Sequence, residues 1–221
     1  MLIDCHIHES RHSFDSQMDL YQAIATAKSA GLDGLCITNH DNNRLRHEIG
    51  DSCYIDGMLI IVGAEILTYE GDILVFGLDD IPEEMMCAQD LLTLVKQQKG
   101  ASIAAHPFRN NNRGIGKNMR RLAPLLTAVE AFNGSTMHAH NLQAFYLANK
   151  LGLPVMGNSD AHVLKQVGYF ATDFKGRIRD HIDFIEAMHS REYTPIMRNG
   201  EEREAGYVSC QVEPSAPLVF G

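Results

Sequence analysis

The chain begins with Met1-Leu-Ile-Asp-Cys-His-Ile-His-Glu-Ser10, and this stretch decides how the remaining sequence is interpreted. Residues 2–5 are mostly apolar and suit a short buried strand. His6 and His8 follow with one residue between them, and side chains two positions apart in an extended chain point to the same face. Two imidazoles on one face suit a single metal ion, although two surface histidines at a strand end would give the same pattern.

Composition restricts the function classes that the chain can serve. With 221 residues, of which 45% are hydrophobic, the chain can form one α/β barrel with a sizeable core. The formal net charge of −9 and the lack of a Lys or Arg run argue against broad binding to nucleic acids or anionic membranes. A small phosphorylated ligand remains compatible, because a bound metal ion can reverse the local charge.

Cysteine usage and the N-terminus indicate a cellular compartment. The five cysteines form no C-x-x-C pair, which is typical of reduced thiols in a cytoplasmic protein. No apolar run approaches the roughly 18 residues of a membrane helix. The N-terminus also lacks the basic start and apolar stretch of a signal peptide. We therefore expect a cytoplasmic protein that does not enter a membrane.

Apolar runs and helical periodicities alternate along the chain. Strands are expected at 2–5, 34–40, 58–66, 72–78, 101–105, 128–132 and 155–158, and helices at 18–31, 88–99, 117–126, 138–151 and 180–191. The strands at 58–66 and 72–78 are close enough to pair as a hairpin or to lie across a tight connection. Seven strands alternating with helices favour a single barrel domain over residues 1–221, in which 199–221 is an irregular extension.

Potential metal ligands follow these strands: His6, His8, His40, Glu65, His106, Asp160 and His162. In α/β barrels the carboxyl ends of the strands share one face, so these side chains would converge there. Each has a simpler explanation: a loop histidine, a turn residue before Pro107, or a helix cap at Asp160. Glu65 is harder to explain in that way, since a carboxylate in an apolar strand is costly to bury without a cation. We expect a shared metal site.

The ligand types indicate which metal ions the site would hold. Imidazoles and carboxylates without paired cysteines suit Zn, Mn or Fe. The number of ligands exceeds the needs of one ion, so we expect two or three divalent ions. Neighbouring ions of this kind clamp the attacking and leaving oxygens in phosphoester hydrolysis.

The motifs together resemble the PHP (polymerase and histidinol phosphatase) family. They are Asp-x-His-x-His at 4–8, Ile-Thr-Asn-His-Asp at 37–41, Gly-Ala-Glu at 63–65, Ala-His-Pro at 105–107 and Asn-Ser-Asp-Ala-His at 158–162. The resemblance covers nearly the whole chain and implies a distorted (β/α)7 TIM-like barrel with up to three metal ions at the carboxyl ends of the strands.

The resemblance also implies how the ligands are shared. His6 and His8 would hold one ion with Glu65 and Asp160, Glu65 would bridge to a second ion at His106, and a third ion would bind His40 and His162. A further ligand is expected after His8, for which Asp15 is favoured over His12. Asp72 stands where many members have a histidine; it either binds metal through oxygen or starts a strand facing solvent.

Other polar residues are expected around the metal ions. Glu130 and Asn133 end the sixth strand and would orient ligands or contact substrate, unless they are turn residues. Arg109 and Arg113 lie in the loop after the fifth strand, where a guanidinium could bind phosphate in a bidentate way or simply be solvated. Lesser candidates for phosphate binding are Lys165, His138 and Arg11.

These features predict a phosphoesterase that hydrolyses a small phosphomonoester of the histidinol phosphate, nucleotide or sugar phosphate type. A hydroxide activated by the metal ions would attack, with His162 or Asp160 moving the proton. The partner would be a small phosphorylated metabolite, and the apolar end of the tail hints at a homo-oligomer. Alternatives are a nuclease or editing module, a non-catalytic metal-binding module, and an amide or lactone hydrolase, for which a lysine at a strand end is missing.

Overall fold

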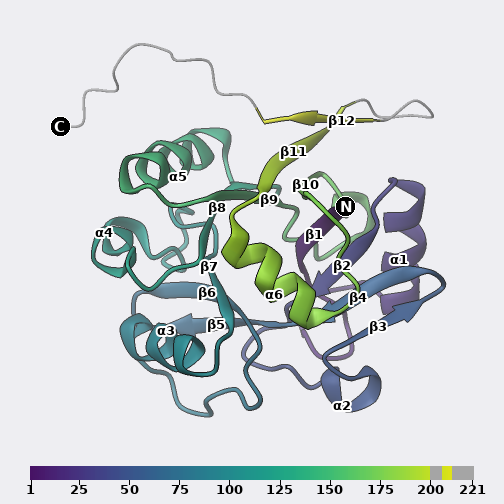
Figure 1. Cartoon of the computed structure of the whole chain (residues 1–221), viewed down its shortest axis with the longest axis horizontal. Coiled ribbons are helices and arrows are strands. Elements are labelled where there is room, and N and C mark those ends of the chain that lie inside the picture. Colours follow the sequence, from purple (N-terminus) through teal and green to yellow (C-terminus); the bar gives the residue numbers. More distant parts are fainter. Residues whose placement is uncertain (200–205, 211–221) are drawn as a thin grey trace.

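The computed structural model describes residues 1–199 and 206–210, whose strands form two mixed sheets (Figure 1). In order across the first sheet are β12 (Gly206–Ser209), β11 (Tyr193–Asn199), β10 (Phe170–Phe174), β1 (Leu2–Ile7), β2 (Gly34–Ile37), β4 (Met58–Val62) and β3 (Ser52–Ile55). The second sheet consists of β5 (Ala64–Thr68), β6 (Gly71–Phe76), β7 (Ala101–Ala104), β8 (Ala128–Asn133) and β9 (Val155–Asn158).

The helices lie mainly where helical spacing predicts them. They are α1 (Leu20–Ser29), α2 (Arg46–Ile49), α3 (Ala88–Gln97), α4 (Met119–Leu122), α5 (His138–Leu151) and α6 (His181–Ser190), with 3₁₀ turns η1 (Gly116–Asn118) and η2 (Leu164–Gln166). Asp19 caps α1 by accepting hydrogen bonds from two backbone N–H groups, and Gly152 ends α5 at φ 68°. The expected helix at 117–126 is shortened to η1 and α4, and α2 was not expected.

The two sheets form a mixed α/β fold but not one continuous barrel sheet. β1 runs parallel to β2, and β7, β8 and β9 are parallel to one another. The sheets are linked by isolated bridges at Ile7–Ala161 and His40–Glu65. Four further strands, β3, β10, β11 and β12, add antiparallel pairs that alternation of strands and helices did not predict. The α/β class is confirmed, whereas closure into a seven-stranded barrel is not.

The expected strand at 58–66 is divided in two at Gly63. A Cβ atom at Gly63 would lie 2.5 Å from the Phe76 ring, so only glycine fits where the chain passes from one sheet to the other. β4 therefore stays in the first sheet, and Glu65 is the second residue of β5 rather than the end of a long strand. β5 and β6 pair as an antiparallel hairpin, which is one of the two arrangements that their spacing in the sequence left open.

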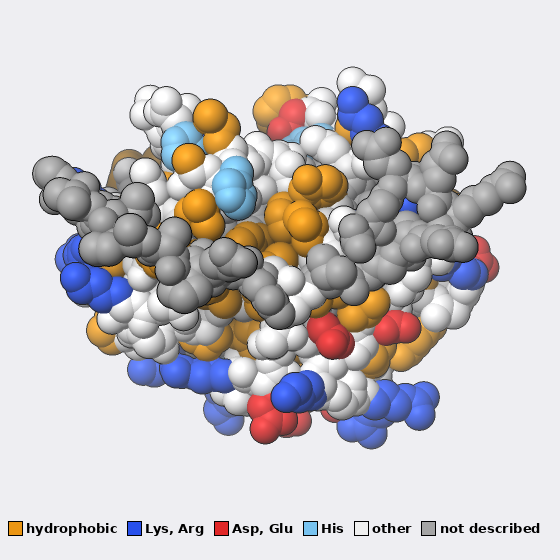
Figure 2. Space-filling model, turned by 90° about the horizontal axis from the view of Figure 1, so that it is seen from above, with side chains coloured by type: hydrophobic (Ala, Val, Ile, Leu, Met, Phe, Trp, Pro, Cys, Tyr) orange, Lys and Arg blue, Asp and Glu red, His pale blue; other side chains and the backbone are white. Residues whose placement is uncertain are grey.

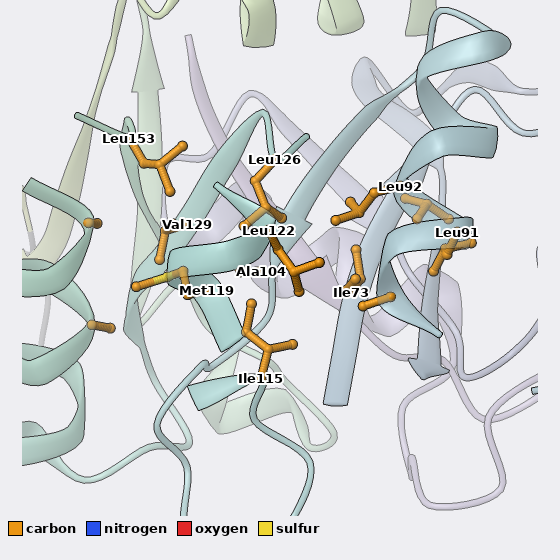
Figure 3. Packing of buried hydrophobic residues seen from close by; sticks show 14 of the residues in the cluster. Ile73, Leu91, Leu92, Ala104, Ile115, Met119, Leu122, Leu126, Val129 and Leu153 are labelled. Atoms are coloured by element: carbon orange, nitrogen blue, oxygen red, sulfur yellow. The ribbon is translucent and has the colours of Figure 1, made fainter. Parts of the chain in front are cut away.

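The core has one inner layer and two outer layers. Residues from both sheets pack together with Phe184 and Met188 of α6, which crosses the strands in Figure 1. Outside the second sheet, Ile73 and Val129 of the strands pack in one cluster with Leu122 of α4 and with side chains of α3 and α5 (Figure 3). A third cluster lies between α1 and the first sheet. Burial on both faces of the strands explains why they are nearly continuous apolar runs.

The C-terminal segment differs in part from the expected irregular extension. Residues 206–209 form β12 and pair with β11, because the extended backbone of β11 offers a free edge. Residues 200–205 and 211–221 lie outside the described part of the chain.

The surface contains charges of both signs. On the face drawn in Figure 2, Lys and Arg side chains stand at the rim as separate groups among acidic and hydrophobic ones. Among the described residues, no helix is both long and apolar enough to cross a membrane.

Candidate metal centre

Segments far apart in the sequence bring their polar side chains to one end of the sheets. His6 and His8 end β1 or follow it directly, His40 follows β2, His106 follows β7, and Asp160 and His162 follow β9. Asp72 lies near the start of β6, but β6 runs antiparallel to β5 and β7, so its start lies at the end where those strands finish. Asp72 is fully buried and does not face solvent.

Four of these side chains surround a common point. The Nε2 atoms of His6 and His8 each lie 3.3 Å from Glu65 Oε2 and 3.4 Å from Asp160 Oδ1. Within the described residues, all four atoms are buried and have no hydrogen-bond partner. Buried polar atoms normally find such partners, so four unpartnered atoms facing one another indicate a site for a cation. We call this group the four-ligand cage.

The spacing within the four-ligand cage fits a tetrahedral metal ion. An ion with ligand distances of about 2.0–2.1 Å separates its ligand atoms by roughly 3.3–3.4 Å. The donors are two imidazole nitrogens and two carboxylate oxygens, which suit Zn, Mn or Fe. The residues present therefore fit a metal ion.

Two further groups adjoin the cage and share members with it. Glu65, Asp72 and His106 form one group, in which His106 Nε2 lies 2.8 Å from Glu65 Oε1 and 3.8 Å from Asp72 Oδ2. His106 Nδ1 is buried and without a partner among the described residues. His8, His40 and His162 form the other group, in which the His8 ring centroid lies 4.4 Å from His40 and 4.2 Å from His162.

The structure separates the two candidates for the further ligand after His8. Asp15 Oδ2 lies 3.0 Å from His40 Nε2 and 3.2 Å from His162 Nε2, beside the three-histidine group. His12 instead contacts Glu9 at 2.6 Å and Glu48 at 3.5 Å. The structure thus brings Asp15, and not His12, into the cluster.

Glu130 and Asn133 lie behind the candidate ligands. Glu130 Oε1 lies 2.9 Å from His6 Nδ1 and accepts a hydrogen bond from Asn158 at 3.0 Å, while Oε2 accepts from the His106 backbone and Asn133 at 2.8 Å. Because Nδ1 of His6 donates a hydrogen bond to Glu130, Nε2 is the ring nitrogen that is left to face the cage. Asn133 also donates to Asp160 at 3.3 Å.

Asp4 is a supporting residue for which the sequence suggested no role. It is fully buried and accepts hydrogen bonds from the backbone of Ser159 and Gly168 at 2.9 and 3.0 Å, and from the Ser159 hydroxyl. These bonds fix the turn before Asp160, which adopts a φ of 51°. A carboxylate in an apolar strand was the available signal, as it was for Glu65.

The two loop arginines both reach the centre. Arg109 hydrogen-bonds Asp160 Oδ2 and Asn133 Oδ1, the latter at 2.7 Å. Arg113 binds both oxygens of Asp72, at 2.6 and 2.9 Å. The lesser candidates lie on the surface: Lys165 and His138 are exposed, and Arg11 pairs with Glu48.

The charges of the cluster shift its pKa values in opposite directions. Burial alone would lower the pKa of His6, but Asp160, Glu130 and Glu65 raise it well above its usual value. Burial would raise the pKa of Asp160, but His6, His8 and Arg109 hold it well below its usual range. Burial and the positive charge of His8 lower the pKa of His162. The carboxylates of the cage are therefore ionised, and His162 is neutral at pH 7.

At the level of sequence, the chain is similar to one family model and to one uncharacterized protein. Residues 138–193, which carry Asp160 and His162, match the model described as PHP-associated. The uncharacterized protein MJ1587 of Methanocaldococcus jannaschii is 29% identical over 143 residues, which cover 60% of this chain and 82% of that protein.

Three solved structures share the fold. PsfC from Pseudomonas syringae PB-5123 has 23% identity and a TM-score of 0.68, covering 83% of this chain and 87% of that one. A two-domain protein of Bacteroides vulgatus, containing a predicted PHP-like metal-dependent phosphoesterase, has 21% identity and a TM-score of 0.63, covering 88% and 64%. The lesion-specific endonuclease PfuEndoQ from Pyrococcus furiosus has 16% identity and a TM-score of 0.61, covering 86% and 56%.

The family model described as PHP-associated thus matches one segment of the chain, and the solved structures show a shared fold. An endonuclease has the same fold, so the fold alone does not separate small phosphorylated substrates from nucleic acids.

Proposed function

We propose that the chain is a metal-dependent hydrolase of phosphoric esters that acts on a small phosphomonoester. The observation that carries this proposal is the four-ligand cage, whose buried atoms on His6, His8, Glu65 and Asp160 have no partner among the described residues. Four unpartnered ligand atoms would be a large cost to folding without a cation. The neighbouring groups share Glu65 and His8 with the cage, which favours more than one ion.

The candidate ligands are assigned as follows. His6, His8, Glu65 and Asp160 would hold one divalent ion; His40, His162 and Asp15, beside His8, would hold another; and His106 with Glu65, and in principle Asp72, offers a third position. Zn, Mn and Fe suit these donors. When bound, the ions would supply positive charge for phosphoryl oxygens and lower the pKa of water.

The protein's own groups would orient the phosphate and move the proton. Arg109, fixed by Asn133 and by Thr136 at 3.0 Å, holds its guanidinium beside Asp160, where it can meet a phosphate oxygen. While His162 holds an ion through one ring nitrogen, only the other nitrogen is left to exchange a proton with substrate, and a side-chain exposure of 24% makes the ring reachable for this exchange. Asp160 is ionised too firmly for that role and serves as a ligand.

A small substrate is favoured by the short connections around the centre. Between β6 and β7 the chain forms only α3 and its flanking loops, so no inserted domain covers this part of the centre. Nothing in this arrangement distinguishes among histidinol phosphate, nucleotide and sugar phosphate types, which share the phosphomonoester.

Metal content and phosphate release test the proposal together. Protein purified without chelator is expected to hold at least one equivalent of transition metal and to release phosphate from an aryl phosphate. His8→Ala should lower phosphate release by at least 100-fold, since it removes a cage ligand shared with a second group. His12→Ala is the matched control, because His12 faces Glu9 and Glu48, and it should retain activity.

A panel of substrates separates the alternatives. Phosphorylated metabolites, an oligonucleotide and unphosphorylated esters and amides would be compared under the same conditions. Preference for the oligonucleotide would replace the phosphomonoester with a nuclease function. Equal turnover of unphosphorylated compounds would contradict phosphoester hydrolysis, and metal below one equivalent would contradict the centre itself.

A further inference from the structure

The two loop arginines bind their carboxylate partners in different ways. Arg109 contacts Oδ2 of Asp160 and leaves Oδ1 unpartnered in the four-ligand cage. Arg113 takes both oxygens of Asp72, with Nε 2.6 Å from Oδ2 and a terminal nitrogen 2.9 Å from Oδ1. A bidentate guanidinium–carboxylate pair is among the strongest charge-assisted hydrogen bonds. Asp72, unlike Asp160, has both of its oxygens engaged by a cation.

The backbone around Arg113 holds the guanidinium in this position. Gly71, at φ +136°, has so little space that a Cβ atom would lie 2.6–2.7 Å from the backbone of residues 113–115. Gly114 is pressed against Pro107, where a Cβ atom would lie 2.4 Å from the carbonyl oxygen. The Asp72 N–H also donates to the Arg113 carbonyl at 2.7 Å. The loop is therefore attached directly to the start of β6 and to the segment after His106.

The guanidinium reaches into the centre itself. A terminal nitrogen of Arg113 lies 3.4 Å from His40 Nδ1, and the charges of Asp72 and Glu65 raise the pKa of Arg113. In the group formed by Glu65, Asp72 and His106, Glu65 Oε1 already pairs with His106 Nε2 at 2.8 Å. The ligand atoms of the cage have no hydrogen-bond partner among the described residues, although Glu65 Oε2 lies 3.0 Å from His40 Nδ1, whereas Glu65 Oε1 and both Asp72 oxygens have such partners.

The balance of charges in the cluster also argues against an ion beside Arg113. The carboxylates of the cluster are Asp15, Glu65, Asp72, Glu130 and Asp160, and its fixed cations are Arg109 and Arg113. Five carboxylates and two guanidinium groups leave three negative charges, which two divalent ions already exceed by one. A third ion beside Arg113 would place two positive centres on one carboxylate, which costs free energy unless the guanidinium leaves.

We propose that Arg113 is a built-in cation that takes the place of an ion at the position formed by Glu65, Asp72 and His106. The chain then holds two divalent ions, one in the four-ligand cage and one at His40, His162 and Asp15. Asp72 serves as the anchor of Arg113 and not as a metal ligand. This inference rests on the proposed metal-dependent function and sets the number of ions.

The test is the number of ions bound per chain. Each protein would be dialysed against a range of free Zn²⁺ and analysed by elemental mass spectrometry. The wild type is expected to reach two equivalents, and Arg113→Met, which frees Asp72, three. Arg113→Lys keeps a positive charge and should stay at two. Arg109→Met is the matched control and should also stay at two, because Asp160 already offers Oδ1 to the cage.

A second variant, Asp72→Asn, provides a test that is independent of whether Arg113→Met folds. Asp72→Asn should still bind two equivalents, since Asp72 is not a ligand, whereas loss of one equivalent would overturn the inference. Three equivalents in the wild type, or two in a correctly folded Arg113→Met, would also overturn it while leaving the proposed hydrolase intact. Less than one equivalent in the wild type would instead reject the metal centre and, with it, both proposals.

Discussion

Single buried carboxylates organise the centre at the residue scale. Asp4, Glu65 and Glu130 all lie in strands and are at most 2% exposed, yet each has a different task. Glu65 faces the candidate ions, Glu130 fixes the proton position on His6, and Asp4 holds the turn before Asp160. A buried carboxylate requires partners, so its neighbours are constrained as firmly as the carboxylate itself.

Replacing Glu130 tests this division of tasks. Glu130→Gln keeps the size of the side chain but removes the negative charge that accepts the His6 Nδ1 proton. We expect metal affinity to fall by about 10- to 100-fold, with the number of bound ions unchanged, since no ligand is removed. Competition with a chelating dye measures this affinity.

An equal affinity in Glu130→Gln and the wild type would mean that the carboxylate does not orient His6. Asn141→Ala provides a comparison in the same region, because Asn141 bonds the backbone of Asn133 and contacts none of the cage ligands. That variant is expected to lower stability rather than metal affinity.

At the scale of elements, the sequence predicts best what is long and buried on both faces. The strands that carry the candidate ligands and the longer helices were expected close to their observed positions, because burial on both faces leaves a continuous apolar signal. β3, β10, β11 and β12 were not expected. They add antiparallel pairs that the alternation of strands and helices does not encode, and the sequences of β3 and β11 lack a continuous apolar run.

The sequence likewise predicted the part of the site that depends on the order of the strands. Ligands such as His8 and Asp160 follow strands, so strand order alone brings them together. The pairing of Arg113 with Asp72, and the choice of Asp15 over His12, depend on loop geometry that no periodicity in the sequence encodes. The division at Gly63 depends equally on a distant contact with Phe76.

The cap of α1 gives a prediction for an element outside the centre. Asp19 accepts hydrogen bonds from the N–H groups of Tyr21 and Gln22 at 2.9 and 3.3 Å. Asp19→Ala should lower the free energy of unfolding by about 1 kcal/mol, measured by urea denaturation, without changing metal binding. Cys87 is the N-cap residue of α3 and makes no side-chain cap bond, so Cys87→Ala is the matched control and should cost less. A larger loss at Cys87 would contradict this account.

At the scale of the whole molecule, the candidate ions lie beside the two isolated bridges that join the sheets. One isolated bridge pairs His40 with Glu65, and the other pairs Ile7 with Ala161, next to Asp160. His8 and Glu65 each donate one backbone hydrogen bond across these junctions, at 3.1 Å. An ion in the four-ligand cage would add bonds from β1 of the first sheet to Glu65 of the second.

Removal of the metal ions should therefore weaken the contact between the two sheets and also lower the activity. A ligand present at 100 times its Kd stabilises the folded state by about 2.7 kcal/mol, which corresponds to roughly 5–10 °C in Tm for a chain of this size. Treatment with a chelator should lower Tm by about that amount and speed amide exchange at His8 and Glu65, whose N–H groups lie at the junctions. Treatment with a chelator should lower the Tm of His12→Ala by the same amount as that of the wild type. It should lower the Tm of His8→Ala much less, because the cage of this variant no longer binds an ion. Equal exchange rates with and without metal would mean that the ions do not join the sheets.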